Sequence, residues 1–370
     1  MKTGKDLTLI VGGGPAGSAC AYELAKSGRY CLLLEKEEIP REKVCGGILS
    51  HRAASVLVGS GMISTQELEE LTLRKHSTIT FWDRGEYLRR YTSPSDPVRI
   101  VSRSRFDGFL LRRAASAGAE VLAGRKVESV DRVSAATSSG ETVFFRHLVG
   151  ADGTTSIVRR LVSGRRSRKT GMGLHYLVPL RELEREPEGL EVHFGHIPYG
   201  YIWVIPGKDS VNIGAGALGS PASPSDIVEA LGEFMGSIKC PVSHRQLRGA
   251  AIPSLVLHRD LGMDNIYLAG DAAGLVDQVS GEGIGHAAES GMLVARCILS
   301  GDRRGTLLKN SGTCIDLVRQ SIFYRHLLHS RPARGTAMMS LRDSEEFARG
   351  YWNIISGTES YNEMFSRILG

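Results

Sequence analysis

Three short runs of consecutive apolar residues each lead into a glycine-rich turn and then into a helical pattern. The runs are residues 7–11, 148–150 and 266–269, and the helical segments that follow are residues 15–27, 156–160 and 281–299. A run of this length without polar alternation is typical of a strand that is buried on both faces of a parallel sheet. The order of these elements predicts an α/β fold with a Rossmann-like sheet.

Apolar and polar positions alternate in two other parts of the chain, residues 77–82 and about 171–250. This alternation predicts antiparallel strands with one face on a core. We expect the two kinds of element to interleave in one discontinuous arrangement. Residues 1–75, 100–165 and 260–300 would build a nucleotide-binding domain, residues 76–99 and 166–259 an antiparallel-sheet domain, and residues 301–370 a helical C-terminal region.

The first glycine-rich turn, residues 12–17, reads G-x-G-x-x-G and carries the clearest chemistry. Its first glycine permits a tight turn, its second lets the backbone approach a pyrophosphate, and its third lets helix and strand pack closely. The helix N-terminus offers N–H groups and a positive dipole end to phosphates. A second apolar strand is predicted over residues 30–34, and the carboxylate of Glu35 directly after it can accept ribose hydroxyls. The residues expected to hold a dinucleotide here are Gly12, Gly14, Pro15, Ala16, Gly17, Glu35 and Lys36.

Residues 214–219 also read G-x-G-x-x-G, but we do not expect a second nucleotide site there. Two prolines in the segment 220–224 prevent a helix from starting at the required place. The pattern instead predicts strand and turn, without a separate nicotinamide-binding domain.

Composition narrows the class of protein. The net charge of +6 fits anionic ligands or an anionic membrane surface, but no dense Lys/Arg block with interleaved aromatic residues indicates a nucleic-acid partner. Six cysteines form no CxxC pair, so we expect no metal site and no disulfide framework. No signal peptide and no apolar run of about 20 residues is evident. We expect a cytoplasmic protein, at most peripheral to the inner face of the membrane.

Three further segments carry a resemblance to a known family. Lys43, Cys45, Gly46 and Gly47 match a K-x-CGG loop, residues 201–206 match Y-x-W-x-F-P with isoleucine in place of phenylalanine, and residues 270–285 match a GDAAG-to-GEGI segment. Together with the first turn, they make the chain similar to the geranylgeranyl reductase branch of the aromatic hydroxylase-like flavoproteins. The similarity runs from the N-terminus to about residue 291.

The resemblance implies FAD as the cofactor and assigns further residues to it. Two positions, Gln278 and His286, depart from the usual pattern of the branch beside the flavin. Asp152 has two interpretations of equal weight, a ligand contact and an architectural role. The residues that the resemblance adds to the FAD site are Cys45, Gly46, Gly47, Arg103, Val127, Asp152, Gly270, Asp271, Gly281, Gly283 and Ile284.

Three side chains are candidates for the reaction itself. Cys45 could act as a proton donor or tune the flavin, although a small side chain in a tight turn is the simpler interpretation. Tyr201 and Trp203 alternate along a predicted strand and should face the same side. There they would line an apolar pocket, with Tyr201 as a proton donor, or form the inner core of the sheet.

The activity implied by the resemblance is reduction of isolated C=C bonds in a polyprenyl (geranylgeranyl-type) lipid, with hydride from N5 of reduced FAD. The electron donor, NAD(P)H or a ferredoxin-like redox partner protein, stays open. The alternative is a flavin-dependent monooxygenase or halogenase acting on an aromatic or other electron-rich substrate. A third possibility is a non-catalytic electron relay. The C-terminal region could cap the pocket or contact a membrane.

A pair of histidines and a run of basic residues could suggest a metal site and a charged binding surface, but we expect neither function. His193 and His196 lie three positions apart in an extended segment, so we expect surface histidines on opposite faces. The basic residues Arg159, Arg160, Arg165, Arg166, Arg168 and Lys169 are expected to form solvated faces.

Overall fold

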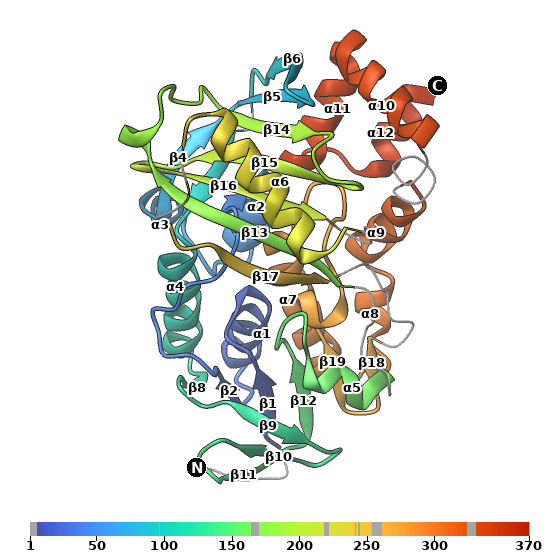
Figure 1. Cartoon of the computed structure of the whole chain (residues 1–370). Helices are drawn as coiled ribbons and strands as arrows, with labels where there is room; N and C mark the ends of the chain where they lie inside the picture. The colour runs from blue at the N-terminus through green and yellow to red at the C-terminus, as the bar shows by residue number, and fades with distance from the viewer. Residues whose placement is uncertain are drawn as a thin grey trace.

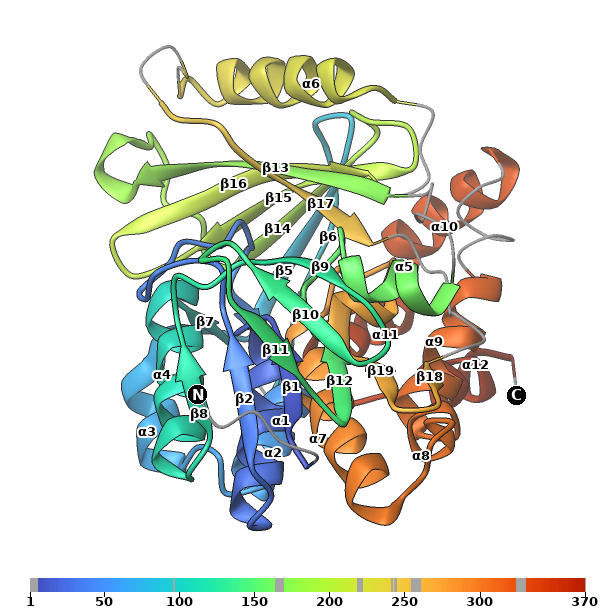
Figure 2. The ribbon, with the colours of Figure 1, turned by 90° about the horizontal axis from the view of Figure 1, so that it is seen from below.

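The computed structural model describes residues 6–95, 97–163, 170–217, 222–240, 242, 245–253, 261–323 and 331–369. Two large sheets lie one above the other, and helices of the C-terminal region pack along one side of both (Figures 1 and 2). The described helices include none that is both long and apolar enough to cross a membrane.

The lower sheet has six strands in the order β18-β19-β12-β1-β2-β8 and is parallel apart from the β18–β19 pair. Helices α1 (Pro15–Lys26), α4 (Arg103–Ser116) and α7 (Ile284–Ser300) accompany it. The predicted Rossmann-like fold is confirmed, because all three apolar runs became adjacent strands of this sheet. The strand bounds are β1 (Thr8–Val11), β2 (Cys31–Leu34), β8 (Glu120–Leu122), β12 (His147–Gly150), β18 (Gly262–Met263) and β19 (Ile266–Leu268).

Glycines bring the two long helices of this domain into close contact. A Cβ added at Gly291 of α7 would lie 2.1 Å from the carbonyl oxygen of Ala16 in α1, so only glycine fits there. The same test at Gly17 gives 1.9 Å to the carbonyl oxygen of Gly12. The N-terminus of α1 is therefore fixed against both its own strand and α7.

The upper sheet has seven strands in the order β17-β13-β16-β15-β14-β5-β6. Helix α6 (Pro224–Ser237) covers its outer face, and the lower sheet with its helices lies on the other side (Figure 2). The predicted antiparallel sheet is confirmed with one exception, since β5 and β14 run parallel. The strand bounds are β5 (Thr78–Asp83), β6 (Glu86–Thr92), β13 (Thr170–Pro179), β14 (Leu190–Phe194), β15 (Gly200–Pro206), β16 (Ser210–Ala217) and β17 (Arg248–Pro253).

Two small three-stranded sheets, which the sequence did not predict, complete the strands. One joins β3 (Ile48–Leu49), β7 (Val98–Val101) and β4 (Thr72–His76), and the other joins β11 (Thr142–Phe144), β10 (Ser134–Thr137) and β9 (Val127–Val130). The other short helices before α7 are α2 (His51–Gly59), α3 (Thr65–Leu71) and α5 (Ile157–Ser163), and there are two 3-10 turns, η1 (Leu180–Glu182) and η2 (Gly270–Ala273).

The chain after residue 301 is helical where it is described. Its helices are α8 (Thr306–Lys309), α9 (Gly312–Phe323), α10 (Arg331–Asp343), α11 (Glu345–Ser356) and α12 (Tyr361–Leu369). Helix α11 packs on the edge of the upper sheet, where the rings of Tyr351 and Phe81 meet edge to face at 5.1 Å and Trp352 is fully buried.

Candidate active site

The first glycine-rich turn forms an open cradle at the carboxyl end of β1. Gly12 adopts a φ of +104°, which an L side chain rarely adopts. Glu35 is buried at the end of β2 and accepts the N–H of Gly13 at 2.7 Å and that of Glu37 at 3.0 Å. No described side chain caps the N-terminus of α1. Its N–H groups are therefore oriented for an anionic ligand.

Three basic side chains surround this cradle. Arg103 makes a bidentate pair with Asp107, with both hydrogen bonds at 2.9 Å, and Arg41 reaches the same carboxylate at 3.0 Å. Burial opposes the charge of Arg103, but Asp107 outweighs it and raises the pKa of the guanidinium. Lys43 lies 3.7 Å from Asp271. Arg41 was missed from the sequence because it belongs to no recognisable motif.

One oxygen of Asp152 supports the architectural interpretation, while a contact of this carboxylate with the cofactor stays a prediction. Its Oδ2 accepts the N–H of Ile157 at 2.7 Å and so caps α5. Burial raises the pKa of this carboxyl group, although its hydrogen bonds act in the opposite direction. Arg159 corrects an expectation: it is 5% exposed and donates to the carbonyl oxygen of Ala272 at 3.2 Å. Arg160 is exposed, and the other four basic residues of that patch lie outside the described residues.

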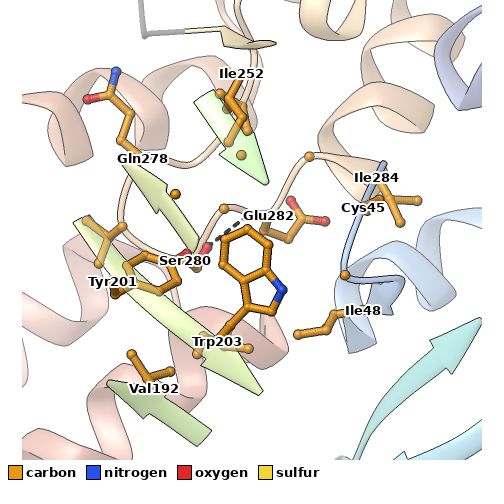
Figure 3. Close-up of a pocket in the computed structure, with 18 of the residues that line it drawn as sticks. Cys45, Ile48, Val192, Tyr201, Trp203, Ile252, Gln278, Ser280, Glu282 and Ile284 are labelled. Carbon is orange, nitrogen blue, oxygen red and sulfur yellow. Dashed lines mark hydrogen bonds between the residues drawn. The ribbon is translucent and has the colours of Figure 1, made fainter. Parts of the chain in front are cut away.

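A cavity of about 370 Å³ extends from the cradle under the upper sheet to the C-terminal helices. Figure 3 shows part of its lining, including Cys45, Tyr201 and Trp203. One wall includes the loops at residues 43–48 and 278–284, and the far wall includes residues of α10, α11 and α12. Tyr201 and Trp203 both line it, with their ring centroids 6.2 Å apart, so they face the same side as predicted. The apolar side chains of the far wall are Ala337, Met338, Leu341, Phe347, Ile354, Ile355 and Met364.

The indole of Trp203 is fixed by a hydrogen-bond chain that reaches the K-x-CGG loop. Its Nε1 donates to Oδ1 of Asn212 at 2.8 Å, and Nδ2 of Asn212 donates to the carbonyl oxygen of Cys45 at 3.1 Å. The same nitrogen lies 2.9 Å from Nδ1 of His175, whose pKa burial and Arg248 lower to about 4. A neutral His175 can accept this hydrogen bond at neutral pH. Asn212 therefore links the upper sheet to the loop.

The second G-x-G-x-x-G segment, residues 214–219, contains the glycines that pack against the indole of Trp203. A Cβ at Gly214 would lie 2.3 Å from Cζ2 of Trp203, and one at Gly216 would lie 3.1 Å from Cζ3. Both glycines are in β16, directly beside β15, and the predicted strand is confirmed up to residue 217. The glycines thus leave space for a flat ring on the sheet, while Leu218 and Gly219 lie outside the described residues.

The GEGI segment places a buried ion pair at the start of α7. Nδ1 of His286 lies 2.7 Å from Oε2 of Glu282, and Oε1 of Glu282 accepts the N–H of Gly285 at 2.8 Å. Burial opposes ionisation of both groups, but their mutual attraction prevails. It lowers the pKa of Glu282 to about 2 and raises that of His286. Nearby charges that also act on His286 are Arg52 and Asp277.

The stability of the protein should therefore depend on pH through this pair. The contribution of Glu282 is present above its unfolded pKa of about 4.3 and is lost as the pH falls toward 2. That of His286 is present below its unfolded pKa of about 6.5 and is lost as the pH rises through its raised value. We expect His286→Gln to cost about 3 kcal/mol at pH 6, and this cost should fall as the pH rises through the raised pKa of His286. Urea unfolding of both proteins at a series of pH values from 6 upward measures this.

A cost of His286→Gln that stays the same over the whole pH series would contradict a charged pair.

Some of the predicted cofactor residues are not part of the cavity lining, namely Gly12, Gly17, Glu35, Lys36, Val127, Asp152 and Gly270. Lys36 has a largely exposed side chain near Glu37, and Val127 is buried in β9. The prediction of surface histidines on opposite faces was wrong. His193 is buried, and the rings of His193 and His196 both meet Phe234 of α6, at 4.7 and 5.7 Å. The strand is covered on both faces, so alternation there does not separate core from solvent.

The chain belongs to the FAD binding domain family, which matches residues 6–323. It is an FAD-dependent oxidoreductase. The cradle fits this cofactor. Gly12 and Gly17 hold the tight turn, Gly14 leaves room for a ligand because an added Cβ would meet only Arg41 at 3.7 Å, and the uncapped helix and the buried carboxylate suit the ADP half.

Named relatives confirm the resemblance to geranylgeranyl reductases. The chain is 30% identical over 321 residues to digeranylgeranylglycerophospholipid reductase 2 of Methanothermobacter thermautotrophicus, covering 81% of this chain and 80% of that protein. It is 31% identical over 331 residues to menaquinone reductase of Mycolicibacterium smegmatis, covering 81% and 78%. A geranylgeranyl bacteriochlorophyll reductase-like protein from Thermoplasma acidophilum has the same fold, with a TM-score of 0.78, 21% identity and 99% of both chains covered.

Proposed function

We propose that FAD binds with its ADP half in the glycine cradle and its flavin between the loops at residues 43–47 and 281–284. Glu35 would accept the ribose hydroxyls, and the amides at the start of α1 would bind the pyrophosphate. The amides of Gly283 and Ile284, at the N-terminus of α7, would face the flavin ring, where the helix dipole stabilises negative charge. Both loops line the same cavity, which supports this placement.

We further propose that the protein reduces isolated C=C bonds of a polyprenyl lipid. The observation that carries this proposal is the cavity itself, which joins the cofactor loops to an apolar wall built by the C-terminal helices. Bound and reduced, FAD supplies a hydride. The chain supplies position and a dry site, because an isolated alkene offers no charge that hydrogen bonds could stabilise.

The three candidate residues fit different parts of this proposal. A Cβ at Gly281 would lie 3.2 Å from the hydroxyl of Tyr201, and this proximity supports Tyr201 as a candidate proton donor. Trp203 lies flat on its glycines and would position the alkene. Sγ of Cys45 lies 3.4 Å from the N–H of Gly47, a contact that supports its role in the turn.

The test is an anaerobic incubation of the chemically reduced protein with a polyprenyl lipid, followed by mass spectrometry. Reduction of isolated bonds adds two hydrogens, a gain of about 2 Da, for each bond. The protein left oxidised is the control and should leave the lipid unchanged. An unchanged lipid with the reduced protein, together with oxygen-dependent conversion of an aromatic substrate, would instead favour the monooxygenase or halogenase alternative.

Contact with a membrane and the identity of the electron donor stay predictions. A lipid substrate gives the protein a reason to approach a membrane surface, and the net charge of +6 suits anionic headgroups. NAD(P)H and a ferredoxin-like protein are distinguished by measuring which of them bleaches the flavin absorbance.

A further inference from the structure

The loop between η2 and α7, residues 274–283, is held by a buried carboxylate. Oδ1 of Asp277 accepts the N–H groups of Val279 at 2.8 Å and Ser280 at 2.9 Å. The hydroxyl of Tyr361, the first residue of α12, donates to the same carboxylate, with its oxygens at 2.9 and 3.1 Å. Asp277 therefore joins the loop to the last helix of the chain.

Helix α9 reinforces this junction. In the amide orientation that satisfies its partners, the oxygen of Gln320 accepts the N–H groups of Gln278 at 2.9 Å and Val279 at 3.2 Å. The backbone N–H of Tyr361 donates to Asp316 of α9 at 3.0 Å. Tyr361 is 2% exposed, so neither its backbone nor its hydroxyl can exchange these partners freely for water.

The carboxylate at the centre of the junction is costly to bury. Burial raises the pKa of Asp277, while its backbone donors, the nearby His286 and the Tyr361 hydroxyl act in the opposite direction. Removal of one donor should therefore leave a carboxylate that rearranges its remaining contacts. Those contacts are the N–H groups of the loop itself.

Tyr361 also lies in the wall of the cavity described above. It lines the cavity together with Met364 of the same helix, although α12 lies beyond residue 323, where the match to the FAD binding domain family ends. One side chain thus contacts both the proposed substrate space and the carboxylate that fixes the proposed flavin loop.

We propose that Tyr361 is a positioning residue for the flavin, and that its hydrogen bond to Asp277 couples occupancy of the cavity to the redox properties of the cofactor. The proposal rests on the proposed function for the placement of residues 281–284 beside the flavin. A ligand that displaces the start of α12 moves the donor to Asp277 and, through it, the loop. Such coupling is reciprocal, so the redox state of the flavin also changes the affinity for the ligand.

The test compares the purified holoenzyme with its Tyr361→Phe variant, which keeps the ring and removes the hydroxyl. We expect the FAD dissociation constant to rise about tenfold, the factor that corresponds to 1.4 kcal/mol. We also expect a shifted flavin midpoint potential, measured by spectroelectrochemical titration without substrate. Addition of a C20 polyprenyl alcohol to the oxidised wild-type protein should perturb the flavin absorbance, and the perturbation should shrink in the variant.

Two further variants keep the result interpretable. Tyr87→Phe removes a hydroxyl from an exposed tyrosine of β6 and should leave the FAD dissociation constant and the potential unchanged. Asp277→Asn keeps an oxygen for the loop N–H groups and should shift the potential as Tyr361→Phe does, in a protein whose thermal unfolding shows that it folds. A folded Tyr361→Phe variant with wild-type potential and FAD affinity would overturn the proposal. Because both quantities are measured without lipid, they do not depend on whether the polyprenyl assay succeeds.

Discussion

Replacement of Gly17 by valine should yield a protein without bound flavin and with greatly reduced stability. A Cβ at this position would lie 1.9 Å from the carbonyl oxygen of Gly12, which is backbone and cannot move aside as a flexible side chain can. The cost should reach roughly 3 kcal/mol or more, because both the turn and the start of α1 must shift. Flavin absorbance after purification and urea unfolding measure the two effects.

A glycine in open space provides the control. Gly232 lies inside α6, where an added Cβ meets nothing within 4 Å. Gly232→Ala should retain flavin and raise stability by about 0.5–1 kcal/mol, since alanine favours helix. A Gly17→Val protein with full flavin occupancy would show that this turn does not hold the cofactor.

Gly214→Ala should impair the reduction of the polyprenyl lipid while FAD stays bound. The added methyl group would lie 2.3 Å from the Trp203 ring and 2.5 Å from the carbonyl oxygen of Leu174, so the indole must leave its place. We expect a stability loss of roughly 1–3 kcal/mol, as for other overpacked sites. Polyprenyl reduction should fall at least about tenfold. The FAD dissociation constant should change much less, because the cradle proposed for the ADP half belongs to the other sheet and Trp203 reaches the loop at residues 43–47 through Asn212.

Gly236→Ala is the matched substitution, because Gly236 lies in α6 with nothing within 4 Å of an added Cβ. It should leave the rate of reduction at the wild-type value. Full reductase activity in Gly214→Ala would mean that the position of Trp203 is immaterial to the reaction.

Local patterns in the sequence predicted the strand, turn and helix around the cradle correctly, because these elements are set by neighbours in the chain. In the structure Glu35 accepts the N–H of Gly13, and its binding of ribose hydroxyls stays a prediction. The resemblance supplied the two loops that line the cavity. The roles of the single residues in those loops stay predictions until they are tested by substitution.

Contacts between distant residues were beyond such patterns. Asn212 binds a residue 167 positions away, and Tyr361 binds one 84 positions away, so neither forms part of a motif. Arg159 looked like a member of a solvated basic run, yet buried carbonyl oxygens near η2 take its guanidinium as their donor. The type of side chain alone does not reveal that these carbonyl oxygens need a donor, because they come close to Arg159 only when the chain has folded.

The parallel pairing of β5 with β14 has a consequence for synthesis of the chain. Residue 79 of β5 can pair with residue 190 of β14 only after that residue has been synthesised. The lower sheet is likewise incomplete until β12 and then β19 have been added beside β1. Neither half can therefore finish folding at the ribosome as an independent N-terminal unit, and such non-local pairing slows folding. On the proposed assignment, the nascent chain acquires its flavin only after residue 284 has emerged, when most of the polypeptide has already been made.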